Sequence, residues 1–181
     1  MIKNNLLPAF AWLGASLFFI HPAANPFSYL LILRAAIIFG CLLVRVMPSR
    51  QAPNYQRVIS WGSTILPCFL RATFNPADLG SIVGFILMVM GTVVVGHACV
   101  DLNRSFGVSP ASRPFTSTGI YRWLRHPMYL GHLVCEMGFI VAAPSTNNIL
   151  IGLSCWLLYS VRKQWEKEFY LSERSDFTFA K

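Results

Sequence analysis

Charged side chains are scarce in this sequence. Asp, Glu, Lys and Arg together make up 12% of the 181 residues, which is about half their share in a typical soluble domain. Hydrophobic residues make up 55%, and the mean hydropathy is +0.52. This composition excludes a disordered chain, a collagen-like chain and a water-soluble globule. Lipid is therefore the expected solvent for most of the protein.

Paired cysteines and glycine-rich nucleotide loops are also missing. The cysteines lie within apolar stretches, with no C-x-x-C spacing: Cys41, Cys68, Cys99, Cys135 and Cys155. A disulfide framework or a structural zinc site is therefore not expected, and small buried thiols are the simpler interpretation. No G-x-G-x-x-G sequence occurs, so the usual fingerprint of a soluble dinucleotide-binding domain is absent.

The sequence does contain six apolar stretches. They are residues 6–20, 29–46, 58–70, 79–100, 128–143 and 149–161. Only 79–100 has the ~20 residues that cross a hydrocarbon layer unaided, but the others are flanked by Trp, Tyr, Pro or Asn that suit the interface. The weakest is 58–70, which contains Pro67 and either spans, re-enters or lies along the surface. The sequence thus predicts an all-α integral membrane protein, a single domain over residues 1–181 with five to six transmembrane helices.

Basic residues outnumber acidic ones by 15 to 7, for a net charge of +8. If six stretches span and the N-terminus is cytoplasmic, Arg71 alone lies outside and Arg34 lies within a span. The remaining basic residues are cytoplasmic: Lys3, Arg45, Arg50, Arg57, Arg104, Arg113, Arg122, Arg125, Arg162, Lys163, Lys167, Arg174 and Lys181. Such a bias is typical of cytoplasmic loops. The charge therefore indicates topology and contact with anionic lipid headgroups, not nucleic-acid binding, and both termini are predicted to be cytoplasmic.

The loop before the fifth stretch contains the most distinctive residues. Residues 118–131 are Thr-Gly-Ile-Tyr-Arg-Trp-Leu-Arg-His-Pro-Met-Tyr-Leu-Gly. Pro127 suits the first position of a helix, and the aromatic side chains suit the headgroup level of a bilayer. On residue types alone, a basic juxtamembrane anchor explains this segment.

The order of these residues, above all Arg-His-Pro-x-Tyr at 125–129, resembles the motif of the isoprenylcysteine carboxyl methyltransferase family and of related membrane phospholipid methyltransferases. In these families a helical hairpin and a short amphipathic tail with a Glu-Glu pair follow the motif. The corresponding hairpin here is 128–161 and the tail is 162–171, within a resemblance that covers roughly 102–177. The paired acids appear as Glu166-Lys167-Glu168, so either glutamate matches the pattern.

The resemblance implies S-adenosylmethionine (SAM) as the methyl donor, in a cofactor pocket formed at the cytoplasmic face by the loop and the tail. The cofactor-binding residues that it implies are Gly119, Tyr121, Arg125, His126, Pro127, Tyr129, Glu166 and Glu168. Arg125 and Glu168 are the predicted catalytic residues, and Arg125 suits forked hydrogen bonding to the methionine carboxylate. A sulfonium is a cation, which tyrosine faces and carboxylates favour. No metal is implied.

The implied acceptor is a lipid-like or prenylated small molecule that enters from the bilayer. Carboxylate O-methylation is favoured, with N-methylation of a phospholipid or another amine as the alternative. Methyl transfer needs mainly positioning and exclusion of water. A carboxylate acceptor needs no base, whereas an amine must arrive neutral or lose a proton. The acceptor atom and the oligomeric state stay open.

Several polar residues fall inside the predicted spans. Glu136 lies ten residues after His126, about 15 Å along a helix and near mid-bilayer. Helical spacing places four side chains on one face: His126, Tyr129, His132 and Glu136. Ionisable groups at this depth are normally paired or functional, and Arg34 and His97 are candidate partners. Either a structural pair locks the helices, or Arg34, His132 and Glu136 line the acceptor site.

Two other functional classes remain as alternatives. His97 and His132, on the fourth and fifth stretches, could face each other in a membrane haem or metal protein. A non-enzymatic lipid carrier would bind no SAM. The Arg-His-Pro-x-Tyr order argues against a carrier, because lipid contact alone does not require it.

Overall fold

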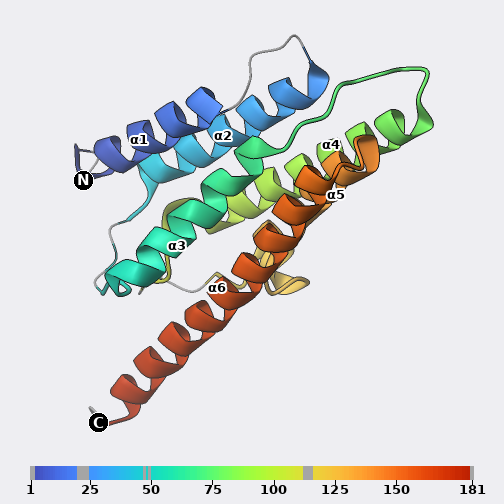
Figure 1. Cartoon of the computed structure of the whole chain (residues 1–181). Helices are drawn as coiled ribbons and strands as arrows, with labels where there is room; N and C mark the ends of the chain where they lie inside the picture. Colours follow the sequence, from blue (N-terminus) through green and yellow to red (C-terminus); the bar gives the residue numbers. More distant parts are fainter. Residues whose placement is uncertain (1–2, 20–24, 47, 49, 112–115, 180–181) are drawn as a thin grey trace.

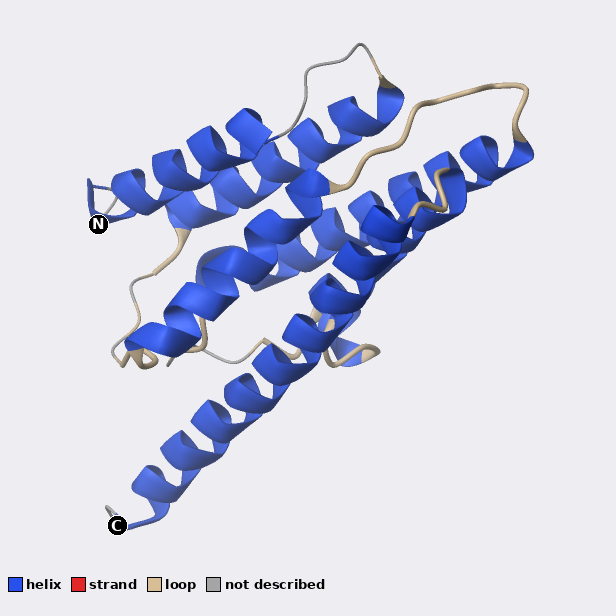
Figure 2. Ribbon diagram, in the orientation of Figure 1, coloured by secondary structure: helices blue, strands red, loops and turns tan. Residues whose placement is uncertain are grey.

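The computed structural model describes residues 3–19, 25–46, 48, 50–111 and 116–179 (Figure 1). These residues form helices and loops, with a single isolated β-bridge between Gln51 and Ala111, which confirms the all-α prediction (Figure 2). The elements are α1 (Lys3–Phe19), α2 (Pro26–Val44), α3 (Asn54–Ile65), η1 (Leu66–Phe69), α4 (Leu79–Leu102), η2 (Asn103–Ser105), η3 (Gly119–Arg122), α5 (Pro127–Ala142) and α6 (Thr146–Phe179), where η marks a 3-10 helix.

Successive long helices run in alternating directions along the bundle (Figure 1). At one end, the Val46 amide after α2 donates to the Arg104 carbonyl after α4 at 2.8 Å. We call this the motif end, because α5 and the motif at 118–131 begin there. At the opposite, distal end, the Arg71 amide donates to Asn148 Oδ1 at 3.1 Å, and Asn148 Nδ2 donates back to the Arg71 carbonyl at 2.7 Å.

The stretch 58–70, the weakest of the predicted spans, lies within α3 and η1. The Ala52 amide, just before α3, donates to the Pro110 carbonyl at the motif end (3.3 Å), and η1 ends just before Arg71 at the distal end. Pro67 lies at the start of η1, where a residue without an amide hydrogen interrupts the α-helical ladder. This segment therefore runs from the motif end to the distal end of the bundle.

Among the residues that the structure describes, α2 and the α4–η2 segment are long and apolar enough to cross a membrane, and α5 and residues 6–17 are apolar but shorter. Large apolar side chains are exposed on the outside of the bundle, such as Leu33, Val93 and Leu157. An exposed apolar surface of this kind fits a lipid environment. Among the basic residues counted above, Arg113 and Lys181 lie outside the described residues.

Helices α4 and α5 approach each other closely through glycines. Gly84 and Gly91 on α4 face Gly138 and Gly131 on α5. A Cβ atom on Gly91 would lie 2.5 Å from the Gly131 carbonyl oxygen, and one on Gly138 would lie 2.5 Å from the Gly84 carbonyl oxygen. Small residues allow such backbone contact between membrane helices. We call this contact the glycine seam.

The predicted tail at 162–171 is not a separate element. It continues the second helix of the hairpin, so that α6 runs unbroken over 34 residues and projects beyond the bundle at the motif end (Figures 1 and 2). The Trp165 ring packs edge-on against Tyr55 of α3, with 6.0 Å between the ring centroids. The tail is therefore held against the bundle by α3.

Candidate functional site

The motif begins with a turn that is fixed to the end of α4. The Ile120 amide donates to Asp101 Oδ2 at 2.7 Å. Gly119 has a φ of +56°, and a Cβ atom there would overlap the Asp101 carboxylate. Glycine is thus required at 119 both for the left-handed backbone and for the close approach of Asp101. This structural role was not predicted for Gly119.

Helix α5 begins as the sequence predicts, with Pro127 in its first turn, where the missing amide hydrogen costs nothing. His126 occupies the cap position, and its carbonyl accepts from the Leu130 amide at 3.2 Å. One helical turn later, Tyr129 is buried and points toward α6. The Arg-His-Pro-x-Tyr order therefore places His126 and Tyr129 on the same side of the helix start, with 5.9 Å between their ring centroids.

Tyr129 joins the motif to the tail. Its hydroxyl donates to Glu166 Oε1 at 2.5 Å. The Arg162 guanidinium carbon lies 5.1 Å from the centroid of its ring, close enough for a cation–π contact. The Tyr159 ring centroid lies 5.4 Å away. Tyr129 is thus surrounded by three side chains from successive turns of α6.

Tyr121 and His126, which both lie outside the apolar helices, have shifted pKa values. Burial raises the pKa of Tyr121, and the negative charges of Glu166 and Asp101 add to this shift. Burial lowers the pKa of His126, Lys163 and Arg125 lower it further, and Glu166 opposes the shift. His126 is therefore a neutral imidazole at pH 7 that can accept or donate a hydrogen bond.

The structure brings together only part of the predicted donor site. Tyr121, His126, Tyr129 and Glu166 lie within one electrostatic and hydrogen-bonded group. Arg125 is exposed at its edge, and Glu168 is exposed with no hydrogen bond or ion pair to any residue in the described part of the chain. Glu166 and Glu168 lie two residues apart on one helix, about 200° around the axis, so only Glu166 reaches Tyr129.

Arg162 is a member of this site that the sequence interpretation counted only as a cytoplasmic charge. It is buried, and its guanidinium donates to Ser63 Oγ at 2.9 Å, to Thr64 Oγ1 at 3.4 Å and to the Val108 carbonyl. Arg162 therefore ties α6 to α3 and to the loop while lying over Tyr129. The sequence could have indicated this role, because Arg162 lies one helical turn before Glu166 on the same helix.

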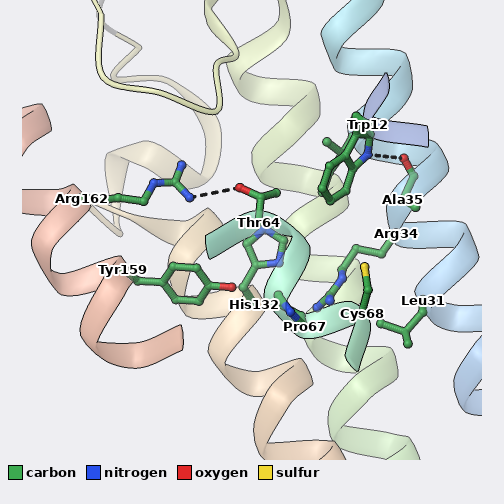
Figure 3. A pocket seen from close by; sticks show the side chains of 11 residues that line it. Trp12, Leu31, Arg34, Ala35, Thr64, Pro67, Cys68, His132, Tyr159 and Arg162 are labelled. Carbon is green, nitrogen blue, oxygen red and sulfur yellow. Dashed lines mark hydrogen bonds between the residues drawn. The ribbon is translucent and has the colours of Figure 1, made fainter. Parts of the chain in front are cut away.

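A cavity of about 20 Å³ lies inside the bundle (Figure 3). It adjoins this group, because Tyr159 and Arg162, which both contact Tyr129, lie in its wall. We call it the interior cavity. It is lined by Trp12, Leu31, Arg34, Ala35, Ile38, Thr64, Pro67, Cys68, His132, Tyr159 and Arg162. Such a volume holds about one water-sized group. Figure 3 shows Arg34 extending from α2, and His132 from α5, into the space between the helices.

Glu136 has a partner that the sequence interpretation did not name. The Tyr159 hydroxyl donates to Glu136 Oε1 at 2.7 Å. Neither of the partners considered, Arg34 or His97, forms a hydrogen bond or ion pair with Glu136 in the described part of the chain. The predicted shared face of α5 is nevertheless present, because Tyr129, His132 and Glu136 all contact Tyr159.

His97 lies elsewhere. It is exposed in an apolar groove of about 740 Å³ between α2 and α4, together with Gly40, Cys99 and Asn103. His132 lines the interior cavity instead, so the two histidines do not share a cavity. Among the described residues, no three His, Cys, Asp or Glu side chains form a group that could hold a metal ion. The geometry on which the haem or metal alternative depends is therefore not found.

Comparison with known proteins identifies a family for most of the segment that builds this site. Residues 79–173, just over half of the chain, match the family described as phospholipid methyltransferase. The chain belongs to the phospholipid methyltransferase family. The match begins at Leu79, one helix before the resemblance noted in the sequence, and it contains Asp101, the motif and Glu166.

Two rice proteins are also similar to this chain. Both are named probable protein-S-isoprenylcysteine O-methyltransferase, one from Oryza sativa subsp. indica and one from subsp. japonica. Each is 28% identical over 99 residues, which cover 51% of this chain and 51% of the relative. The chain thus spans about half the length of these curated relatives. No solved structure matches it.

The family match divides the polar residues into two sets. Tyr129, Glu166 and Arg162 lie inside the matched segment, whereas Trp12, Arg34 and Thr64 lie before it. The group around Tyr129 is therefore built from the part shared with the phospholipid methyltransferase family. The interior cavity is completed by helices outside that part.

Proposed function

We propose that this chain transfers a methyl group from SAM to a lipophilic acceptor at the cytoplasmic face of a membrane. The observation that carries the proposal is the Tyr129–Glu166 hydrogen bond, which joins the Arg-His-Pro-x-Tyr motif to the tail of α6. Family membership supports a membrane methyltransferase. The alternating connections of the helices support a multi-pass topology of six spans with both termini in the cytoplasm.

The residues at the motif end fit a zwitterionic sulfonium donor. When bound, SAM supplies an electrophilic methyl group. Tyr121, Tyr129 and Glu166 provide the aromatic and anionic surroundings that favour a cation, and neutral His126 adds no repelling charge. Arg125 at the edge holds the donor carboxylate, Gly119 and Pro127 shape the backbone around it, and Glu168 takes a polar group of the donor that extends along the tail.

The polar residues of the interior cavity face the acceptor. Arg34 and His132 line the cavity, and Glu136 lies beside it, where it accepts a hydrogen bond from Tyr159 of the cavity wall. An acceptor head placed among these residues lies between the donor and the bilayer interior. Carboxylate O-methylation is the favoured reaction, because a carboxylate oxygen attacks without needing a base. An amine or phospholipid N-methyltransferase is the second candidate, favoured by the description of the matched family.

The test uses the purified chain in detergent with methyl-labelled SAM. SAM binding is measured by calorimetry, and label transfer is measured to a membrane lipid extract and to a prenylated cysteine analogue. Glu166→Gln and Tyr129→Phe are expected to weaken SAM binding about tenfold, the scale of a lost charge-assisted hydrogen bond. Lys167→Gln, an exposed neighbour on the same helix, is the matched control. The enzyme proposal fails if wild-type protein neither binds SAM nor labels any acceptor.

A further inference from the structure

Two cysteines from different helices meet in the apolar groove between α2 and α4, which we call the α2–α4 groove. Cys41 lies on α2 and Cys99 on α4, and both line this groove. Their side chains are close enough to share a hydrogen bond. Both are free thiols, and Cys41 is half-buried while Cys99 is 3% exposed. Neither thiol belongs to the donor or acceptor sites proposed above.

The packing of the two helices places these thiols opposite each other. Helices α2 and α4 both end at the motif end, so they run in the same direction. One turn before the cysteines, the Ile37 side chain lies 3.9 Å from the position that a Cβ atom on Gly96 would take. Just after them, the Val46 amide donates to the Arg104 carbonyl at 2.8 Å. In all three pairs the second residue follows the first by 58 or 59 positions, so a single helix register accounts for the contact between the cysteines.

Two thiols that face each other in this way can form a disulfide. The bond needs the sulfur atoms to approach to about 2 Å, which is a short movement for side chains already within hydrogen-bond distance. Burial of a small apolar side chain explains Cys99 alone, but it does not require a second thiol opposite. In reducing compartments, disulfides are usually transient and redox-sensing. A reversible bond is therefore the form that suits a pair at the cytoplasmic end of the helices.

The lining of the α2–α4 groove restricts the oxidant that reaches this pair. The groove has a volume of about 740 Å³, and Val93 and Val100 at its edge are exposed on the outside of the bundle. Among the described residues that line it, none is Asp, Glu, Lys or Arg, and only His97 and Asn103 have polar nitrogen or oxygen atoms in their side chains. A hydrocarbon chain from the bilayer therefore fits the groove, whereas a charged peptide disulfide would lose its hydration there. A hydroperoxide on such a chain brings an oxidising O–O bond to the thiols.

We propose that Cys41 and Cys99 form a redox-active dithiol, which a lipid hydroperoxide in the α2–α4 groove oxidises to a disulfide. The first thiol attacks the terminal peroxide oxygen, which gives a sulfenic acid and releases the lipid alcohol. The second thiol then displaces water from the sulfenic sulfur. Altogether two S–H bonds and the O–O bond break, while one S–S bond and two O–H bonds form. The two electrons that sulfur loses reduce the peroxide, so no further oxidant is needed.

The disulfide acts on the donor site through Asp101. This residue follows Cys99 by two positions and accepts a hydrogen bond from the Ile120 amide at 2.7 Å, which fixes the start of the motif. Cys99 and Cys41 also interact electrostatically with Tyr121. Drawing Cys99 toward α2 displaces Asp101 from the motif, so oxidation weakens SAM binding. This consequence rests on the proposed methyltransferase function, whereas the disulfide itself does not.

The test treats the purified chain in lipid–detergent micelles with linoleic acid hydroperoxide or, as a charged oxidant, with oxidised glutathione. Mass spectrometry of proteolytic peptides is expected to find the Cys41–Cys99 cross-link, lighter by two hydrogen atoms. The hydroperoxide is expected to form it at least about tenfold faster than oxidised glutathione, because access to the thiols limits the rate. The cross-link joins residues 58 positions apart, so the melting temperature should rise by about 5 °C. SAM affinity, measured by calorimetry, should fall about tenfold and recover after reduction with dithiothreitol.

Cys41→Ala is expected to bind SAM as the reduced wild type does, but to lose the cross-link and the response to hydroperoxide. The matched control is Cys135→Ala, which removes a buried thiol that faces Thr92 of α4 instead of a second cysteine; it should still form the cross-link. Absence of the cross-link in oxidised wild-type protein overturns the proposal, and equal rates with the two oxidants overturn the role of the groove. Unchanged SAM affinity after complete cross-linking overturns the effect on the donor site. If the cross-link forms but neither redox state binds SAM, the dithiol stands and the proposed methyltransferase function fails.

Discussion

Helix α5 packs in opposite ways on its two sides. Toward α4 it presents Gly131 and Gly138, and the two backbones touch with no side chain between them. Toward α6 it presents Tyr129, His132 and Glu136, which meet aromatic, cationic and anionic side chains. The first contact is the glycine seam, and we call the second the polar seam.

The difference between the seams shows where the helix is fixed and where it is available for chemistry. The glycine seam is stabilised by dispersion and by direct contact between the two backbones. The polar seam leaves His132 Nδ1 and Glu136 Oε2 buried without partners. A helix interface that only had to be stable would not keep such atoms in an apolar interior. We therefore expect the glycine seam to determine stability and the polar seam to determine activity.

The largest effect on stability is expected from Gly91→Ala, which forces α4 and α5 apart at the glycine seam. The added Cβ would lie 2.5 Å from the Gly131 carbonyl oxygen and 2.6 Å from Cys135 Sγ, so α4 and α5 must separate. Overpacking of this kind costs about 1–3 kcal/mol, and we expect the upper end because backbone atoms are displaced. Thermal unfolding in detergent measures the loss.

Gly40→Ala is the matched control, because nothing lies within 4 Å of the position where its Cβ would be placed. It is expected to raise stability slightly, since alanine restricts the unfolded chain. If the two variants unfold at the same temperature, the close contact between α4 and α5 is not present in the protein.

A smaller loss of stability is expected from Tyr159→Phe in the polar seam. The change removes the Tyr159 hydrogen bond from the buried Glu136 carboxylate, which costs about 1–2 kcal/mol of stability. Glu136→Leu removes the carboxylate itself. The loss of unfolding free energy in the double variant should therefore be smaller than the sum of the losses in the two single variants, by a coupling energy of about 1 kcal/mol. A double-mutant cycle on thermal unfolding measures this coupling.

Glu136→Gln tests whether the Glu136–Tyr159 pair faces the acceptor or only holds α5 and α6 together. If the polar seam faces the acceptor, the substitution changes acceptor turnover and leaves SAM affinity intact. Equal losses of turnover and SAM affinity, together with lower thermal stability, would instead indicate a pair that only holds the helices together.

The sequence predicts the glycine seam less well than the polar seam, for a physical reason. The spacing of Tyr129, His132 and Glu136 follows from helix geometry, so their common face could be predicted from one segment. Gly84 and Gly91, and likewise Gly131 and Gly138, are seven residues apart. Their role, however, depends on which helix packs opposite, and a single segment does not contain that information.

Contacts between distant segments were missed in the same way. Arg162 binds Ser63 and Thr64, 99 and 98 positions earlier in the chain, so its charge was assigned to topology alone. Trp12 and Arg34 meet at the interior cavity only because α1, α2 and α6 converge there. The helical class and the start of α5 at Pro127 were predictable because proline and apolar periodicity act locally.

The smallest effect is expected from the pH dependence of His126, at the start of the polar seam. Its pKa is lowered from the ordinary 6.5, mainly by burial, with Lys163 and Arg125 adding to the shift and Glu166 opposing it. Because the pKa is lower in the folded protein than in the unfolded chain, the unfolded chain binds more protons between these two values. Stability from the neutral imidazole is therefore complete above pH 6.5 and declines as the pH falls toward the folded pKa.

The melting temperature of the wild type should fall more between pH 7.5 and 5.5 than that of His126→Asn, which stays neutral. The difference should be small because the His126 side chain is partly in contact with water. The substitution leaves every other titratable residue in place, so the difference isolates His126. An identical pH dependence of the two proteins would mean that His126 does not experience the burial seen at the polar seam.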